Sequence, residues 1–282
     1  MKADLLVHSA AQLLSAPAGA TPLLGSALDK PLLLADAAVA VVGERIAAVG
    51  PTRDVLARYP EKEAARVLDA AGRLLAPGFV DAHTHLPFAG GREMEFDARA
   101  RGETYEAIAA RGGGIRASVR QLRAISEEDL RAKVSARLGR LLAQGITTVE
   151  AKSGYGLSLE SELKQLRSLV DPASPVEVIP TFLGAHEVPD EYRDRRADYI
   201  ALLTDSMIPE VARAKLARFC DVFCDRGVYT VPEARAILAA GKSHGLRPKL
   251  HADELADVGA AALAAEVGAV SADHLLHASV AG

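Results

Sequence analysis

Two histidines, His83 and His85, stand one residue apart after an apolar run from Leu74 to Val80. On a β-strand, alternate side chains share a face, so an extended backbone would turn both imidazoles to the same side. Two imidazoles in that arrangement can reach one metal ion at about 2.0–2.1 Å. The motif alone also fits two histidines that only pack or face solvent, and the histidines further along the chain decide between these interpretations.

Two more histidines end predicted strands. His251 ends the segment 247–251, His274 ends the segment 269–274, and Glu254 follows His251 by three residues. Three neutral imidazoles suit zinc or iron, and a catalytic site leaves a position open for water, whose pKa the ion lowers. Four histidines at equivalent strand ends therefore predict one metal centre. Glu254 would move protons there, and His274 would polarise a carbonyl or share in water activation.

The segments that would position these residues alternate between strand and helix from residue 75 onward. Ser126 and Thr230 are predicted to cap two of the helices. Alternation of this kind with apolar strands indicates a parallel sheet, and functional residues at several strand ends are typical of a (β/α)₈ TIM-type barrel. The predicted strands are 75–83, 146–151, 176–182, 219–224, 247–251 and 269–274.

Six strands are two fewer than a closed barrel requires. We therefore expect the barrel, residues 75–282, to be truncated at its C-terminal end. Residues 1–74 are predicted to form a small β-rich domain, a partial β-sandwich that would be completed in the full protein. Its clearest element is a hairpin of residues 38–42 and 46–50 around a glycine turn. Residues 13–24 are predicted as a loop and residues 54–59 as a short helix.

The composition excludes several classes of protein. With 49% hydrophobic residues and a net charge of −4, the chain gives no electrostatic reason to bind nucleic acid or an anionic membrane. It has no apolar stretch of the roughly 20 residues that span a bilayer and no secretory h-region, so we expect a cytoplasmic protein. Cys220 and Cys224 are predicted to be buried, reduced thiols. A small-molecule substrate is expected, and a homodimer is the common default.

Several stretches of the chain resemble the amidohydrolase superfamily and, more narrowly, the imidazolonepropionase family. The resemblance covers nearly the whole chain. Residues 77–85, which contain His83 and His85, match a pattern of the whole superfamily. The stretches SGYG and LGAHEVP resemble the imidazolonepropionase family more specifically. The stretches that carry the resemblance are 77–85 (PGFVDAHTH), 88–96 (FAGGREMEF), 112–115 (GGGI), 152–156 (KSGYG), 181–189 (TFLGAHEVP) and 249–254 (KLHADE).

The resemblance implies metal-dependent hydrolysis of the cyclic amide 4-imidazolone-5-propanoate to N-formimidoyl-L-glutamate, a step of histidine degradation. It implies one metal ion, zinc or iron, because the fourth predicted strand has no lysine of the kind that two-metal relatives carry. The planar fork of Arg92 suits the substrate's carboxylate, although taken alone Arg92 would be an ordinary surface residue. The implied roles are metal binding for His83, His85 and His251, catalysis for Glu254 and His274, and substrate binding for Arg92, Tyr105, Tyr155, His186 and Glu254.

Two alternatives stay open at this point. A guanine-type deaminase of the same superfamily would use the same residues, and release of ammonia would reveal it. The 282 residues could instead be an inactive fragment, because the family's last metal ligand, an aspartate on strand eight, would lie beyond Gly282. The glycines at 112–114 match neither GxGxxG nor a P-loop and are predicted to form an active-site loop.

Overall fold

The structure, a computed structural model, describes residues 2–15, 23, 25–29, 32–104, 107–108, 113–171 and 173–280. The chain divides into two compact units, Met1–Gly78 and Phe79–Gly282, each described here by itself. Among the described residues, no helix combines the length and the apolar character needed to cross a membrane.

The first unit is a five-stranded sheet with one helix. The strand order is β3-β2-β1-β4, and β5 pairs with β1. Its buried core includes Leu6 and Ala40 of the sheet and Val55 and Tyr59 from the helical side. The sandwich expected from the sequence stays a prediction. The elements are β1 (Leu5–Ser15), η1 (Gly25–Ala27), β2 (Leu32–Val42), β3 (Arg45–Pro51), α1 (Thr52–Arg58), η2 (Glu61–Glu63), β4 (Val67–Asp69) and β5 (Leu74–Leu75).

The predicted hairpin is present as the antiparallel pair β2 and β3. The predicted loop is wrong at its start, because residues 13–15 continue β1 and pair with β2 from Leu13–Leu34 to Ser15–Leu32. Most of the remaining residues of that loop lie outside the described part of the chain.

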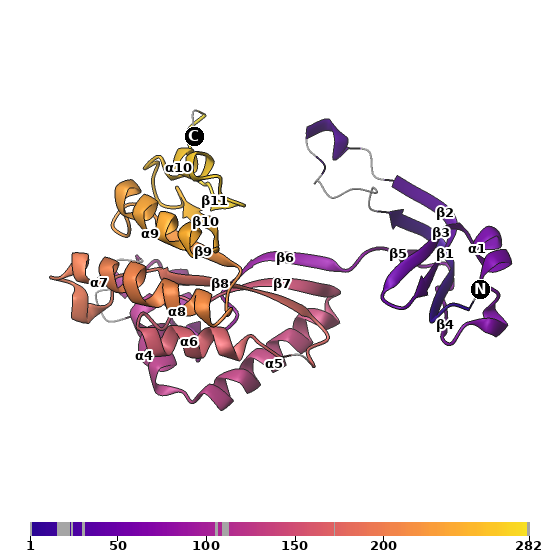
Figure 1. Cartoon of the computed structure of the whole chain (residues 1–282), viewed down its shortest axis with the longest axis horizontal. Coiled ribbons are helices and arrows are strands. Elements are labelled where there is room, and N and C mark those ends of the chain that lie inside the picture. The colour runs from indigo at the N-terminus through magenta and orange to yellow at the C-terminus, as the bar shows by residue number, and fades with distance from the viewer. Residues whose placement is uncertain are drawn as a thin grey trace. The chain divides into compact units, whose positions relative to one another are not determined.

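The second unit is the α/β body, with six parallel strands in the order β11-β10-β9-β8-β7-β6. Figure 1 shows helices alternating with these strands along the chain. The strands are β6 (Phe79–Thr84), β7 (Ile146–Lys152), β8 (Glu177–Ala185), β9 (Phe219–Cys224), β10 (Arg247–Ala252) and β11 (Ala272–His274). The helices are α2 (Glu93–Ala100), α4 (Ile115–Ala124), α5 (Glu127–Ala143), α6 (Leu159–Ser168), η3 (Asp190–Tyr192), α7 (Arg196–Leu202), the π-helical η4 (Leu203–Met207), α8 (Ile208–Arg213), α9 (Val231–Ser243) and α10 (Ala260–Val267).

The sheet of the second unit curves until its two outer strands approach each other. β6 and β11 stand at opposite ends of the strand order, yet His83 on β6 lies 2.9 Å from Asp273 on β11. Helices α5, α6, α9 and α10 pack against β7, β8, β9 and β10 respectively (Figure 1). The predicted barrel class is thus confirmed as a nearly closed parallel sheet of six strands with its helices outside.

The first predicted barrel strand, 75–83, begins too early. Leu74 and Leu75 form β5, which pairs with β1 of the first unit, and β6 begins only at Phe79. Pro77 and Gly78 stand between the two strands. Proline has no amide hydrogen for a sheet and glycine weakens a strand, so this pair interrupts the apolar run.

Both predicted helix caps are present. The Ser126 hydroxyl accepts a hydrogen bond from the Asp129 amide at the start of α5, and Thr230 and Glu233 form a reciprocal capping box at the start of α9. Cys220 and Cys224 on β9 are free and buried, as predicted.

The Glu233 carboxylate of α9 makes stability depend on pH. Its hydrogen bond to Arg196 is the main cause that lowers its pKa to about 2. Because this pKa lies below the ordinary value, the stabilisation is complete above about pH 4.5 and is lost as the pH falls toward 2. We expect Glu233→Gln to lower the free energy of unfolding by about 1 kcal/mol at pH 7.

Urea unfolding at a series of pH values measures the difference between the two proteins, which should shrink as the pH falls from 4.5. The exposed Glu128 on α5 provides the control variant Glu128→Gln. A difference that stays constant down to pH 3 would contradict the predicted linkage.

Candidate active site

Three imidazoles from two strands meet at the carboxyl end of the parallel sheet. His83 lies on β6, His85 follows that strand, and His251 lies near the end of β10. One ring nitrogen of each lies within 4.8 Å of the others, and His85 Nε2 lies 3.2 Å from His251 Nε2. In a tetrahedral site with bonds of about 2.0–2.1 Å, neighbouring ligand atoms lie about 3.3 Å apart. These three residues, the histidine triad, therefore fit a shared metal ion.

In two members of the histidine triad, the Nδ1 atom forms a hydrogen bond to a carboxylate. His83 Nδ1 donates to Asp273 Oδ2 at 2.9 Å, and His251 Nδ1 donates to Asp221 Oδ1 at 3.1 Å. A histidine that donates through Nδ1 keeps Nε2 as a lone-pair ligand. Burial, followed by the neighbouring imidazoles, holds the pKa of His85 well below its usual range. His85 is therefore neutral, as metal ligation requires.

A buried lysine holds the supporting carboxylates in place. Lys152 Nζ at the end of β7 donates to Asp221 Oδ2 at 2.8 Å, to Glu150 Oε1 at 2.9 Å and to Asp273 Oδ2 at 3.4 Å. Burial alone would raise the pKa of Asp221, but the hydrogen bond from His251 and the ammonium of Lys152 hold this pKa well below its usual range. Asp221 is thus a fully buried carboxylate that stays ionised and keeps His251 in one orientation.

This arrangement predicts the effect of Asp221→Asn on metal binding. Loss of a carboxylate behind a ligating histidine typically lowers metal affinity about 10–100-fold, and we expect a loss in that range. Competition with a chromophoric chelator measures the dissociation constant. Asp198→Asn, at an exposed aspartate of α7, is the matched control and should leave the affinity unchanged. An Asp221→Asn protein with the affinity of the wild type would show that Asp221 does not support His251.

Glu254 and His274 lie beside the histidine triad. His274 Nε2 is 3.5 Å from Glu254 Oε2, and the His274 ring centroid is 5.0 Å from that of His83. Asp225 Oδ2 accepts the Glu254 amide at 2.7 Å and so fixes the start of the loop after β10. His274 has a φ of +75°, a strained conformation of the kind that clusters at functional sites. Burial lowers the pKa of His274, so its imidazole is available to accept a proton near neutral pH.

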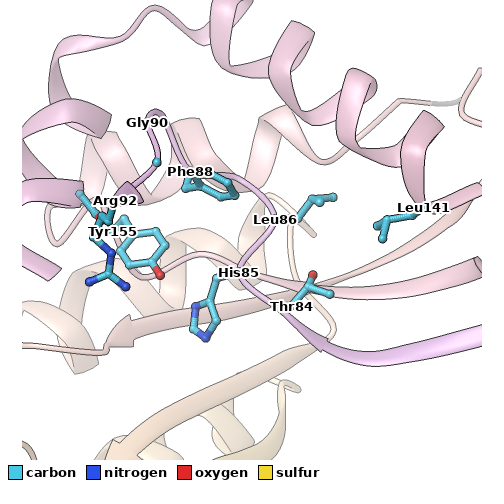
Figure 2. A pocket seen from close by; sticks show the side chains of 10 residues that line it. Thr84, His85, Leu86, Phe88, Gly90, Arg92, Leu141 and Tyr155 are labelled. Atoms are coloured by element: carbon cyan, nitrogen blue, oxygen red, sulfur yellow. The ribbon is translucent and has the colours of Figure 1, made fainter. Parts of the chain in front are cut away.

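A pocket of about 390 Å³ opens next to His85. Figure 2 shows Arg92 and Tyr155 at one end of this pocket and Leu141 at the other, with His85 between them. The pocket thus joins a polar end, which includes a guanidinium, to an apolar end. It is lined by Thr84, His85, Leu86, Phe88, Gly90, Gly91, Arg92, Ser118, Leu141 and Tyr155.

Besides Glu254, the predicted substrate-binding residues fall into three groups. Arg92 precedes α2 and makes a loose ion pair of 3.6 Å with Glu95, which leaves donors of its fork for another carboxylate. Tyr155 and His186 are buried against each other, with ring centroids 5.3 Å apart. Tyr105 lies outside the described residues.

His186 extends the site beyond the pocket. Its ring stacks on that of His85, with centroids 5.0 Å apart and planes at 19°. Its Nδ1 donates to the Gly154 carbonyl at 2.9 Å, so Nε2 is an acceptor. Burial is the main cause that lowers its pKa to about 3. His186 is therefore a neutral imidazole that can accept a hydrogen bond from a ligand.

The structure brings together the predicted triad, Glu254 and His274, and it places Arg92, Tyr155 and His186 around the adjoining space. Sequence reasoning missed the supporting residues Lys152 and Asp221. A signal was present, because Asp221 is the single charged residue of the otherwise apolar strand FCDVFC. Its partner Lys152 lies 69 residues away, and nothing in one sequence links the two.

Solved structures with a similar fold support the architecture. A 5-methylcytosine deaminase from Klebsiella pneumoniae has a TM-score of 0.61 and 18% identity, over 93% of this chain and 55% of its own. An adenosine deaminase from Xanthomonas campestris with bound zinc has a TM-score of 0.53 and 17% identity, over 95% of this chain and 53% of its own. At these identities the likeness establishes the fold alone.

Sequence comparisons are more specific. Residues 37–61 match the model of the imidazolonepropionase-like composite domain of bacteria. The imidazolonepropionase of Symbiobacterium thermophilum is 52% identical over 98% of this chain, and that of Haloarcula marismortui is 48% identical over 98%. The chain belongs to the imidazolonepropionase family. It spans 65% and 64% of the lengths of these two relatives. The imidazolonepropionase match covers both units of the structure, and therefore includes every site residue described above.

Proposed function

We propose that this protein hydrolyses the ring amide of 4-imidazolone-5-propanoate and yields N-formimidoyl-L-glutamate. The observation that carries the proposal is the histidine triad beside Glu254 and His274, next to a pocket that ends in Arg92. The relatives named imidazolonepropionase, about 50% identical along nearly all of this chain, support the choice of substrate.

We propose one metal ion, zinc or iron, bound by His83, His85 and His251. The donor set fits either metal, because imidazole suits both. A bound ion of this kind lowers the pKa of water and polarises a carbonyl. The Lys152 ammonium, whose pKa is raised by Asp221 and Glu150 despite its burial, is held as a cation in the ion cluster beneath the site.

The chain's own residues carry the proton transfers. Glu254 Oε2 takes a proton from the attacking water and returns it to the ring nitrogen as the C–N bond breaks. His274 Nε2, 3.5 Å from that oxygen, shares the proton and donates a hydrogen bond to the oxyanion that develops at the carbonyl. One water is consumed: one of its protons goes to the ring nitrogen, and the other is released to solvent as the former carbonyl carbon becomes a carboxylate.

The remaining residues hold the substrate. Arg92 forms a paired hydrogen bond with the propionate, which fixes the ring at a set distance from the triad. His186 Nε2 accepts a hydrogen bond from a ring N–H of the substrate. Tyr155, which packs against His186, contacts the substrate ring, and Tyr105 is proposed to contact it as well. Glu254 contacts the substrate as well as the water.

The ultraviolet absorbance of imidazolone propionate tests the proposal in the full-length protein with metal bound. The absorbance should decay without release of ammonia, and removal of the metal by a chelator should stop the decay. An unchanged absorbance with metal bound would refute the proposed function.

A further inference from the structure

The loop Ser153–Leu157 follows β7 and carries Tyr155. A buried carboxylate on α6 accepts hydrogen bonds from its backbone. Glu162 on α6 is fully buried and accepts three backbone amides of this loop. Its Oε2 accepts the Gly154 amide at 3.0 Å, and its Oε1 accepts the amides of Gly156 and Leu157, each at 2.8 Å. One side chain thus fixes the backbone on both sides of Tyr155.

Gln165, one turn further along α6, completes the support. Its Oε1 accepts the Tyr155 amide at 3.1 Å and the Gly156 amide at 2.9 Å, and its Nε2 donates to the Pro87 carbonyl at 2.8 Å. Pro87 lies two residues after His85. Gln165 therefore links the loop that carries Tyr155 to the segment that follows His83 and His85.

Two glycines make this close approach possible. Gly154 has a φ of +104°, and a Cβ there would lie 2.8 Å from the Leu183 carbonyl and 3.0 Å from His186 Nδ1. A Cβ on Gly156 would lie 2.6 Å from the Glu162 amide. The SGYG sequence is therefore shaped to lie against both α6 and His186.

Helix capping does not account for Glu162. The Ser158 hydroxyl already caps α6 by accepting the Ser161 amide. The Glu162 carboxylate is instead directed at the loop, and the loop in turn offers the Gly154 carbonyl to His186 Nδ1 at 2.9 Å. The position of the loop therefore determines where two side chains of the site, Tyr155 and His186, lie.

We propose that Glu162 and Gln165 are positioning residues that set the places of Tyr155 and His186 in the site. They do not contact the pocket themselves and act through the backbone of residues 153–157. The consequence for substrate binding rests on the proposed function, whereas the placement of the two side chains does not.

Hydrogen exchange and NMR of the chain labelled at tyrosine and histidine test this proposal without substrate. In Glu162→Gln, the amide nitrogen of the new side chain faces a backbone amide, so exchange at Gly154, Gly156 and Leu157 should become at least about tenfold faster. In Gln165→Met, a side chain of similar length, exchange at Tyr155 and Gly156 should accelerate instead. Both variants should shift the ring signals of Tyr155 and His186, while those of Tyr59 and His8 in the first unit stay in place.

Two controls separate positioning from general loss of stability. Glu160→Gln makes the same chemical change at an exposed site on the same helix. Ile237→Val weakens the packing of α9, a helix that contacts β9 and β10. Neither control should move the Tyr155 and His186 signals. If Glu162→Gln does not fold, Gln165→Met provides the same test.

Unchanged Tyr155 and His186 signals in the folded variants, or equal shifts in Ile237→Val, would overturn the proposal. In the active protein, Glu162→Gln should raise KM at least tenfold with a smaller change in kcat, and an unchanged KM would refute the effect on substrate binding. Failure of the wild type to hydrolyse the imidazolone would instead contradict the proposed function and leave the NMR result standing.

Discussion

Replacing His251 by alanine is expected to lower the affinity for the metal ion by at least about 10²-fold. Structural zinc in zinc-finger peptides binds with about 10–16 kcal/mol shared among four ligands, and on that scale one histidine ligand accounts for several kcal/mol. His251 is central to the triad, because its Nε2 lies 3.2 Å from His85 Nε2 and its ring packs 4.6 Å from that of His83. The metal content after dialysis, measured by mass spectrometry, gives the result directly.

His244→Ala is the matched control for this experiment, because His244 is an exposed histidine at the end of α9. The control should retain as much metal as the wild type. Circular dichroism shows whether the His251→Ala protein remains folded. A folded His251→Ala protein with a full complement of tightly bound metal would place the ion elsewhere.

Glu254→Gln is expected to lower kcat by about 10²–10⁴-fold while the metal content stays the same. The amide keeps the shape of the side chain and removes its ability to take a proton, and general acid–base groups contribute rate factors of this size. Glu254 is not a member of the triad, so metal binding should be unaffected. The rate of absorbance decay of imidazolone propionate, at saturating substrate, measures the effect.

Glu63→Gln, at an exposed glutamate of the first unit, is the control for the loss of one carboxylate and should have the wild-type rate. A Glu254→Gln protein within a few-fold of the wild-type kcat would assign the proton transfer to another group. His274 would then be the next residue to replace.

Much of the fold could be predicted because the relevant signals are local. The apolar strand Phe219–Cys224 was predicted with the bounds that the structure shows, and Thr230 was predicted as the cap of the helix that begins at Val231. Alternation of such elements is enough to indicate a parallel sheet with its functional ends on one side. The errors arise where the partner of a segment decides its structure. Leu74 and Leu75 look like the start of a barrel strand, but their hydrogen bonds go to β1.

The site divides in the same way. His83 and His251 could be proposed from the sequence because strand ends are recognisable and parallel strands share one functional edge. The residues behind them could not, because a charged side chain on a buried strand shows no partner in the sequence. Lys152 and Asp221 form one ion pair across 69 residues, and Glu162 reaches a loop whose backbone conformation depends on two glycines. The first contact depends on how the strands are placed beside one another, and the second depends on the backbone conformation of the loop.

The residues of the histidine triad and its supporting carboxylates are far apart along the chain: His85 and His251 are 166 positions apart, and His83 and Asp273 are 190 positions apart. At about 5–20 residues per second, the ribosome adds His251 roughly ten to thirty seconds after His85. A nascent chain therefore exposes a two-histidine motif well before its third ligand exists. In the metal site proposed above, binding by all three histidines would begin only after translation has passed residue 251 and the curved sheet has formed, so it would be a late event in the maturation of this protein.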